Sequence, residues 1–154
     1  MTPVLGREWL TSHLPHRGAM SLLDEIVAWD DEHLHARATG HGAERHPLRR
    51  AGELPIAAAI EYGAQAVAAH GALVAGDAEP PAAGFLASVR GVTFHADRLD
   101  DIAAPLDVEV DRAGVGAGGV LYSFRVAAAG RLLAEGRVTI VLDAARVGAA
   151  GLPR

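Results

Sequence analysis

One carboxylate interrupts a long apolar stretch in the middle of the chain. The sequence LPIAAAIEYGAQAVAAHGALVAG, from Leu54 to Gly76, contains a single formally charged side chain, Glu61. Burying a carboxylate costs several kcal/mol unless it is protonated or paired. Burial also raises the pKa of a carboxyl, so Glu61 could hold a proton at neutral pH and deliver it as a general acid.

A second candidate for chemistry is His46, in the segment GAERHPLRRAGELP, fifteen residues before Glu61. A neutral imidazole titrates close to pH 7 and can take a proton from carbon or oxygen. Together the two residues form a general acid–base pair in outline, provided that the fold brings them together. In the alternative interpretation His46 is an ordinary loop histidine, and Glu61 is a buried carboxyl that hydrogen-bonds to the backbone. The residues alone favour neither.

The apolar stretch itself predicts one buried helix. Proline is common in the first turn of a helix and glycine just after its end, and Pro55 and Gly76 stand at these two positions. A helix that is apolar nearly all round is buried in a protein core or a membrane. The free N–H groups near Pro55 and Ala57 would lie at the positive end of the helix dipole. A thioester oxygen that gains charge during enolisation would be stabilised there.

Three arginines surround His46 in an otherwise acidic chain: Arg45, Arg49 and Arg50. Such a local basic cluster could bind phosphate or dock an acidic carrier protein. The alternative, a solvated loop with no binding role, explains the same residues equally well.

The histidines give little support for a metal centre. His33 and His35 alternate with apolar residues and fit the polar face of a strand, and His41 and Glu44 precede His46. No secondary-structure spacing fixes a set of three ligands among them, so we expect no bound metal.

Strands are predicted on both sides of the helix. Apolar runs or two-residue alternation indicate strands at residues 21–29, 33–39, 85–95, 106–112, 120–127 and 132–142. Two strands, one long helix and four strands predict an α+β protein with the hotdog fold, a six-stranded antiparallel sheet wrapped around one long central helix. We expect a single domain over residues 1–143 and a C-terminal tail over residues 144–154.

The composition and net charge of the chain indicate which partners and which cellular compartment to expect. The 154 residues include no cysteine and carry a formal net charge of −5. The charge argues against a nucleic-acid partner, and the lack of cysteine excludes disulfides and fits the cytoplasm. No signal peptide is recognisable, and Glu61, Gln65 and His70 interrupt the apolar stretch, so we expect no membrane association.

Two separated segments carry a resemblance to a known family. The segment LPHRGAMSLLDEI, from Leu14 to Ile26, resembles the opening signature of 3-hydroxyacyl-ACP dehydratases of the FabZ type. The order of His46-Pro47, then Pro55, then IEYGAQ resembles their catalytic segment, with proline six residues before the glutamate and glutamine four after it. In its details the pattern is most similar to the ApeP-type dehydratases of aryl-polyene and related specialised pathways.

The resemblance implies a complete enzyme mechanism. The substrate would be a (3R)-hydroxyacyl thioester on an acyl carrier protein, and the product a trans-2-enoyl thioester. His46 from one subunit would take the C2 proton, and Glu61 from the other would protonate the departing hydroxyl. An amide near Ile56 would hold the thioester oxygen, and Ala57, Gln65 and His16 would contribute to substrate binding. No cofactor is required, and the resemblance implies a homodimer whose two sheets join edge to edge; pairing with another hotdog protein is the alternative.

Small residues replace several larger residues of the family pattern. Gly18 and Ala19 stand where FabZ-type enzymes have an aromatic gate, and Gly63 stands where ApeP-type enzymes have methionine. We expect Gly18, Ala57, Ala58 and Gly63 to widen an acyl tunnel for a bulky aryl or polyene chain. Two other functions remain open: a hotdog acyl-thioesterase whose helix carboxylate activates water, and a subunit active only beside a second hotdog protein.

Overall fold

The computed structural model describes residues 4–14, 18–76, 85–116 and 119–141. The strands in these ranges are β1 (Leu5–Gly6), β2 (Glu25–Trp29), β3 (His33–Ala38), β4 (Phe85–Phe94), β5 (Leu106–Gly116), β6 (Gly119–Ala128) and β7 (Arg131–Val141). The helices are α1 (Arg7–His13) and α2 (Ala59–Ala75), with short 3-10 turns at η1 (Gly18–Met20), η2 (Gly40–Gly42) and η3 (Ile56–Ala58). The predicted tail at residues 144–154 lies outside the described residues.

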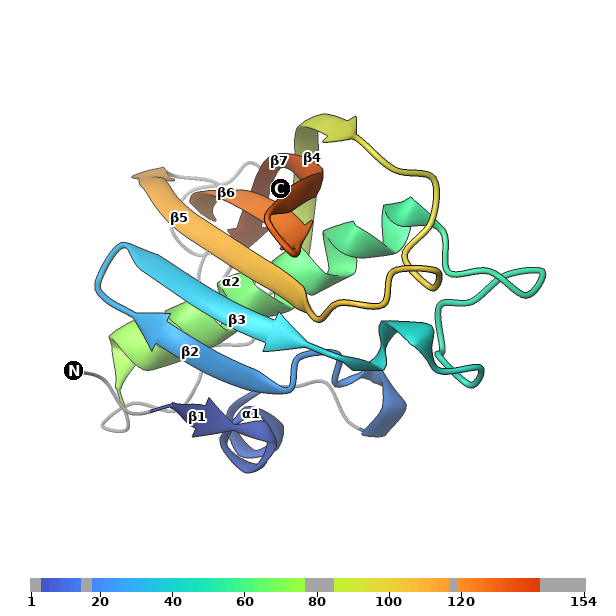
Figure 1. Ribbon diagram of the computed structural model, residues 1–154. Helices are drawn as coiled ribbons and strands as arrows, with labels where there is room; N and C mark the ends of the chain where they lie inside the picture. The colour runs from blue at the N-terminus through green and yellow to red at the C-terminus, as the bar shows by residue number, and fades with distance from the viewer. Residues whose placement is uncertain (1–3, 15–17, 77–84, 117–118, 142–154) are drawn as a thin grey trace, which may run out of the picture.

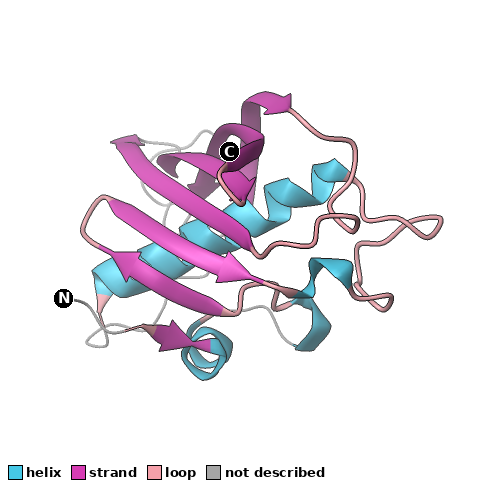
Figure 2. Cartoon of the chain, in the orientation of Figure 1, coloured by secondary structure: helices cyan, strands magenta, loops and turns pink. Residues whose placement is uncertain are grey.

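The strands form one antiparallel sheet in the order β1-β2-β3-β5-β6-β7-β4, which curves around α2 (Figure 1). The single long helix crosses one face of this sheet (Figure 2). The predicted hotdog fold is therefore confirmed, with seven strands in place of six. The additional strand is β1, which pairs only Leu5 with Ile26 and Gly6 with Glu25. Two residues are too few to show a strand period in the sequence.

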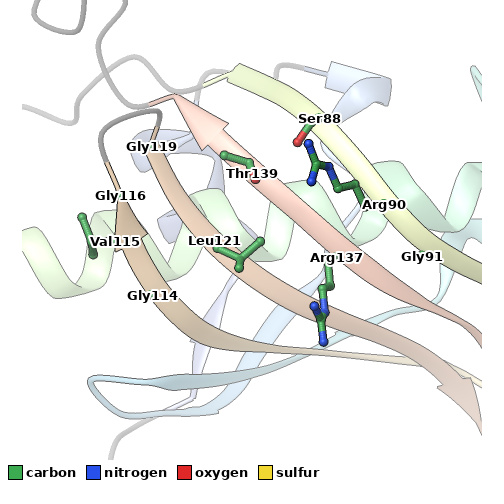
Figure 3. A pocket seen from close by; sticks show the side chains of 10 residues that line it. All are labelled: Ser88, Arg90, Gly91, Gly114, Val115, Gly116, Gly119, Leu121, Arg137 and Thr139. Carbon is green, nitrogen blue, oxygen red and sulfur yellow. The ribbon is translucent and has the colours of Figure 1, made fainter.

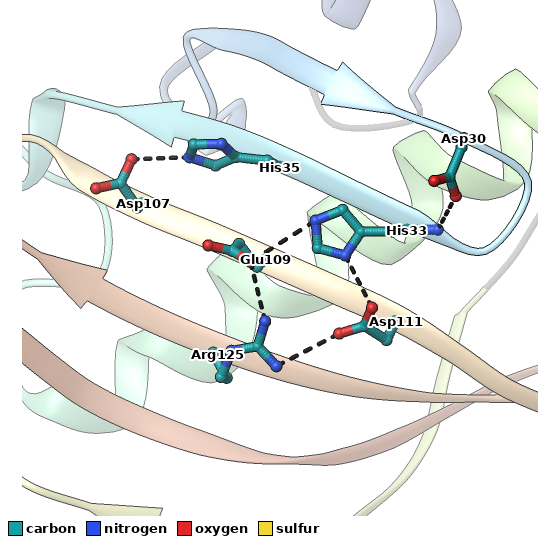
Figure 4. Close-up of polar contacts among 7 residues, drawn as sticks. All are labelled: Asp30, His33, His35, Asp107, Glu109, Asp111 and Arg125. Carbon is teal, nitrogen blue, oxygen red and sulfur yellow. Dashed lines mark hydrogen bonds and ion pairs between the residues drawn. The ribbon is translucent and has the colours of Figure 1, made fainter. Parts of the chain in front are cut away.

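Strict alternation separates the two faces of the sheet. On β5, Leu106, Val108 and Val110 are fully buried against α2. The residues between them point to the outer face, because successive side chains of a strand alternate. There the carboxylates pair across strands with basic side chains (Figure 4); for example, the His35 imidazole lies 2.8 Å from the Asp107 carboxylate. The outer face therefore carries charge while the inner face holds the helix.

The start of the long helix is tied to the connection between β4 and β5. The Leu99 N–H donates to the Leu54 carbonyl (2.8 Å), and the Ile56 N–H donates to the Asp97 carbonyl (3.1 Å). The Asp100 carboxylate also accepts from the Leu54 N–H (2.9 Å). These bonds fix where η3 and α2 begin relative to the sheet.

Glycines allow α2 to lie very close to the sheet. A Cβ atom added at Gly63 would lie 2.9 Å from the Phe124 ring, and one at Gly136 on β7 would lie 3.0 Å from the same ring. Phe124 is only 1% exposed, so it fills the space between the helix and β7. The expectation that Gly63 widens an acyl tunnel is therefore wrong: Gly63 makes room for a core side chain.

Candidate active site

His46 lies in the connection between β3 and α2, which is folded into tight turns. Its N–H donates to the Ala43 carbonyl, and its own carbonyl accepts from the Arg49 N–H, both at 3.1 Å. The Arg49 guanidinium then donates to the carbonyls of Ala43 (2.8 Å), Gly42 (3.0 Å) and Gly52 (2.7 Å). The loop is thus held by one of its own side chains, which gives the His46 backbone a fixed place.

His46 is 9% exposed as a residue, and its side chain is hydrogen-bonded at both ring nitrogens. The Leu48 N–H donates to Nδ1 (3.1 Å), and Nε2 lies 2.9 Å from the hydroxyl oxygen of Tyr62, which is fully buried on α2. Because an amide N–H can only donate, this network assigns the proton of the neutral ring to Nε2. His46 therefore donates to Tyr62 and keeps its lone pair on Nδ1.

Electrostatics keeps both members of this pair uncharged. Burial lowers the pKa of His46, and electrostatic interaction with Arg49 and His41 lowers it further. Burial raises the pKa of Tyr62 well above its ordinary value, so its phenol stays protonated at neutral pH. A neutral imidazole with a fixed orientation is what a general base requires.

Tyr62 is the residue that the sequence analysis missed, because it was counted among the apolar residues of the helix. The chain has only two tyrosines, and a buried phenol needs a hydrogen-bond partner. Each of them bonds to a buried histidine: Tyr62 to His46, and Tyr122 to Nδ1 of His70 at 2.7 Å. The signal in the sequence for these buried contacts was therefore the position of two rare tyrosines within apolar segments.

Glu61 lies on a different face of α2 from Tyr62, because neighbouring residues of a helix point about 100° apart. It shares its face with Ala57, Ala64 and Ala68, and none of these four residues is fully buried. Among the described residues, no hydrogen bond or ion pair joins Glu61 to His46. The expectation that the chain encloses Glu61 is therefore wrong for a single protomer, where the carboxylate is half-buried.

The helix start offers one amide at the expected position. The Ile56 N–H, expected to hold an oxyanion, already donates to the Asp97 carbonyl. Ala57 is the next residue, is exposed, and belongs to the first helical turn, whose amides have no intrahelical acceptor. Ala57 is therefore the better placed of the two candidates to bind an oxyanion.

Gln65 is fully buried and anchors the segment that follows the LPHRG motif. Its side-chain oxygen accepts from the Leu22 N–H (2.9 Å), and its nitrogen donates to the Met20 carbonyl (2.7 Å). These bonds give Gln65 a structural role in place of the expected substrate contact. His16, the other expected binding residue of that motif, lies outside the described residues.

The three arginines of the loop divide into two groups. Arg49 uses its guanidinium inside the loop, and that side chain is only 16% exposed. Arg45 and Arg50 are exposed on either side of it. The candidates for carrier docking are therefore Arg45 and Arg50.

The remaining histidines make contacts within the fold. His33 and His35 pair with carboxylates of β5 on the outer face (Figure 4). His41 is buried, and its Nε2–H donates to the Ile102 carbonyl (2.8 Å). Within the described ranges, no group of three or more histidine, aspartate or glutamate side chains is placed to hold a metal ion.

Comparison with protein families assigns the chain to a family. The ApeP-like family, described as ApeP dehydratase, matches residues 9–147. The chain belongs to this family. The resemblance that the LPHRG and IEYGAQ segments indicated is thus confirmed. No protein of curated function matches this ApeP-like chain at a significant level.

Several solved structures share the fold of the ApeP-like chain. The dehydratase heterocomplex ApeI:P from Xenorhabdus doucetiae is 21% identical, with a TM-score of 0.77 over 92% of this chain and 95% of that chain. AziG from S. sahachiroi is 19% identical (TM-score 0.57, 79% and 90%), and thioesterase superfamily member 2 from Mus musculus is 14% identical (TM-score 0.56, 86% and 91%). In the described part of the chain, no helix has the length and apolar character needed to span a membrane.

Proposed function

We propose that this ApeP-like protein dehydrates bulky 3-hydroxyacyl thioesters on an acyl carrier protein, forming trans-2-enoyl thioesters in aryl-polyene or related specialised biosynthesis. The observation that carries the proposal is a buried, neutral His46 whose ring is oriented by Tyr62 and the Leu48 amide. Membership of a family of dehydratases supports the reaction class. No metal or cofactor takes part in the proposed reaction.

In the proposed reaction His46 takes a proton from C2 of the substrate. Since Nε2 donates to Tyr62, the lone pair that accepts this proton is on Nδ1, where the substrate displaces the weaker contact with the Leu48 N–H. The electron pair moves to the thioester oxygen, which the Ala57 N–H stabilises. The C3–O bond then breaks as Glu61 of a second subunit donates a proton, so that water leaves.

The position of Glu61 supports a site shared between two subunits. Its face of α2 is left partly uncovered by the described residues, and among the described strands β4 pairs with β7 alone. A long unpaired edge strand is a ready surface for pairing with another sheet. We propose that a second hotdog subunit pairs along β4, either as a homodimer or as a heterodimer with another hotdog protein. The structural likeness to a dehydratase heterocomplex supports the second arrangement.

Mass spectrometry of carrier-bound 3-hydroxyacyl chains, aryl and aliphatic, tests the proposal. The wild-type protein should produce a carrier-bound acyl chain that has lost one water, and His46→Ala and Glu61→Ala should each abolish this product. In a homodimer, mixing the two inactive variants should restore about a quarter of the activity. About half of the dimers are then mixed, and each mixed dimer has one intact site out of two. If mixing restores nothing while co-expression with a second hotdog subunit does, the enzyme is the heterodimer. If all variants retain wild-type turnover, the assignment is wrong.

A thioesterase is the alternative function, because hotdog thioesterases share this fold and a helix carboxylate can activate water. The same measurement separates the two reactions. A thioesterase releases a free hydroxy acid and leaves an unloaded carrier, whereas a dehydratase keeps the thioester.

A further inference from the structure

A second candidate binding site lies on the outer face of the sheet (Figure 3). A hollow of about 840 Å³ is bounded by β4, β7 and the end of the hairpin formed by β5 and β6. This volume falls within the range typical of small-molecule pockets. Its residues Arg137 and Thr139 alternate along β7 with the buried Val138 and Ile140. The hollow therefore faces away from α2 and is separate from the site around His46.

Two arginines of the hollow lie on adjacent strands, and their guanidinium groups point in different directions (Figure 3). Arg90 of β4 and Arg137 of β7 are direct cross-strand partners, an arrangement in which like charges repel. Among the described residues, no hydrogen bond or ion pair engages either guanidinium. By contrast, Arg125 on the same face pairs with Glu109 (2.9 Å) and Asp111 (3.4 Å). In a chain of net charge −5, these two exposed arginines are a candidate site for an anion.

The neighbours of the two arginines add further donors and an apolar wall. Ser88 and Thr139 are also cross-strand partners, two residues along each strand, so their hydroxyls lie on the same face. In Figure 3, Arg90 lies beside Ser88 and Arg137 extends over β6. Leu121 lines the hollow between the strands, and Gly114, Gly116 and Gly119 add no side chains to the wall formed by β5 and β6.

We propose that this hollow binds a phosphate ester. Guanidinium groups match the geometry of phosphate oxygens, and hydroxyls can donate to the same oxygens. Leu121 provides apolar surface for the uncharged organic part of the ligand. Coenzyme A and the phosphopantetheine arm of a holo carrier protein both present this chemistry. The proposal does not depend on the reaction assigned to His46.

Calorimetric titration of the purified protein at low salt tests the site with three probes: inorganic phosphate, coenzyme A and pantetheine. Phosphate and coenzyme A should bind, coenzyme A more tightly, and pantetheine should not. The double substitution Arg90→Gln with Arg137→Gln should lower the affinity for coenzyme A by at least about tenfold. The matched control Arg125→Gln removes an arginine that already has carboxylate partners, so it should leave binding within about twofold.

A folding control keeps the result interpretable. Removing one or both arginines relieves like-charge repulsion, so the unliganded variants should melt at the wild-type temperature or above it.

Displacement of coenzyme A by a holo carrier, but not by an apo carrier, would identify the carrier arm as the source of the phosphate. If neither carrier displaces coenzyme A, the source of the phosphate is free coenzyme A. Unchanged coenzyme A binding in the double variant, or equal binding of pantetheine, would overturn the proposal.

Discussion

Replacing Tyr62 with phenylalanine isolates the contact that orients His46. The substitution removes one hydroxyl from a fully buried side chain and leaves the ring in place. The His46 Nε2–H then loses its only acceptor in the described structure, the Tyr62 oxygen at 2.9 Å. The ring of His46 should become free to rotate about its side-chain bonds, held only by the Leu48 N–H.

The expected magnitudes follow from burial. Leaving a buried donor unsatisfied costs about 1–3 kcal/mol in the free energy of unfolding. Misplacing a catalytic group by about 1 Å can cost roughly 100-fold in rate, so we expect kcat to fall by about 10- to 100-fold. The acidic limb of the pH–rate profile should also move to lower pH. An imidazolium donates more strongly than a neutral ring, so losing the Tyr62 oxygen lowers the pKa of His46 further.

Tyr122→Phe is a matched control, because Tyr122 makes the other buried tyrosine–histidine bond, 2.7 Å from His70. Both variants should lose similar stability in urea denaturation, but only Tyr62→Phe should lose dehydration rate and shift its pH–rate profile. If both variants lose stability alike and neither changes the rate, the contact between Tyr62 and His46 is structural, and the reasoning about the base is refuted.

Three further predictions concern packing, pH and docking. Gly63→Ala should destabilise the protein by about 1–3 kcal/mol through overpacking, whereas Gly71→Ala, where a Cβ meets no neighbour, should stabilise it by up to about 1 kcal/mol; urea denaturation compares them. Burial lowers the pKa of His70, so the unfolded chain binds a proton that the folded chain does not, and stability should fall as the pH drops below about 6.5; a His70→Gln variant should show a smaller fall. Arg45→Glu with Arg50→Glu should raise KM for carrier-bound substrate several-fold while leaving KM for a free pantetheine thioester unchanged, a pattern that uncharged substitutions elsewhere in the loop should not reproduce.

The sequence was sufficient to predict the elements in which apolar residues recur at a regular spacing over many positions. Alternation along β5 and β6 predicted which residues are buried, and the end of the long helix lies at Gly76, whose φ of 74° few other residues adopt. These features depend on local chemistry that one segment carries by itself. The two-residue strand β1 and the helix α1 have no such period and were missed.

The site could be predicted only in part, because its contacts join distant segments. His46 and the helix start were found from residue type and position. Which amide at the helix start remains free depends on Asp97, a residue about forty positions further along the chain. The structural role of Gln65 likewise depends on carbonyl and amide groups of residues 20 and 22. Long-range backbone partners of this kind leave no trace in residue spacing.

The proposed arrangement makes each long helix serve two active sites at once. Tyr62 holds His46 of its own chain, while Glu61, one residue earlier on another face, is proposed to reach the partner subunit's site. In a homodimer, substitutions of the two neighbouring residues should therefore behave oppositely when impaired subunits are mixed. Tyr62→Phe should be rescued by Glu61→Ala, because one dimer site then keeps His46, Tyr62 and Glu61 intact. It should not be rescued by His46→Ala, because those two substitutions damage the same half of every site. Rescue by His46→Ala, measured as water loss from the carrier-bound substrate, would show that Tyr62 does not act through the His46 of its own chain.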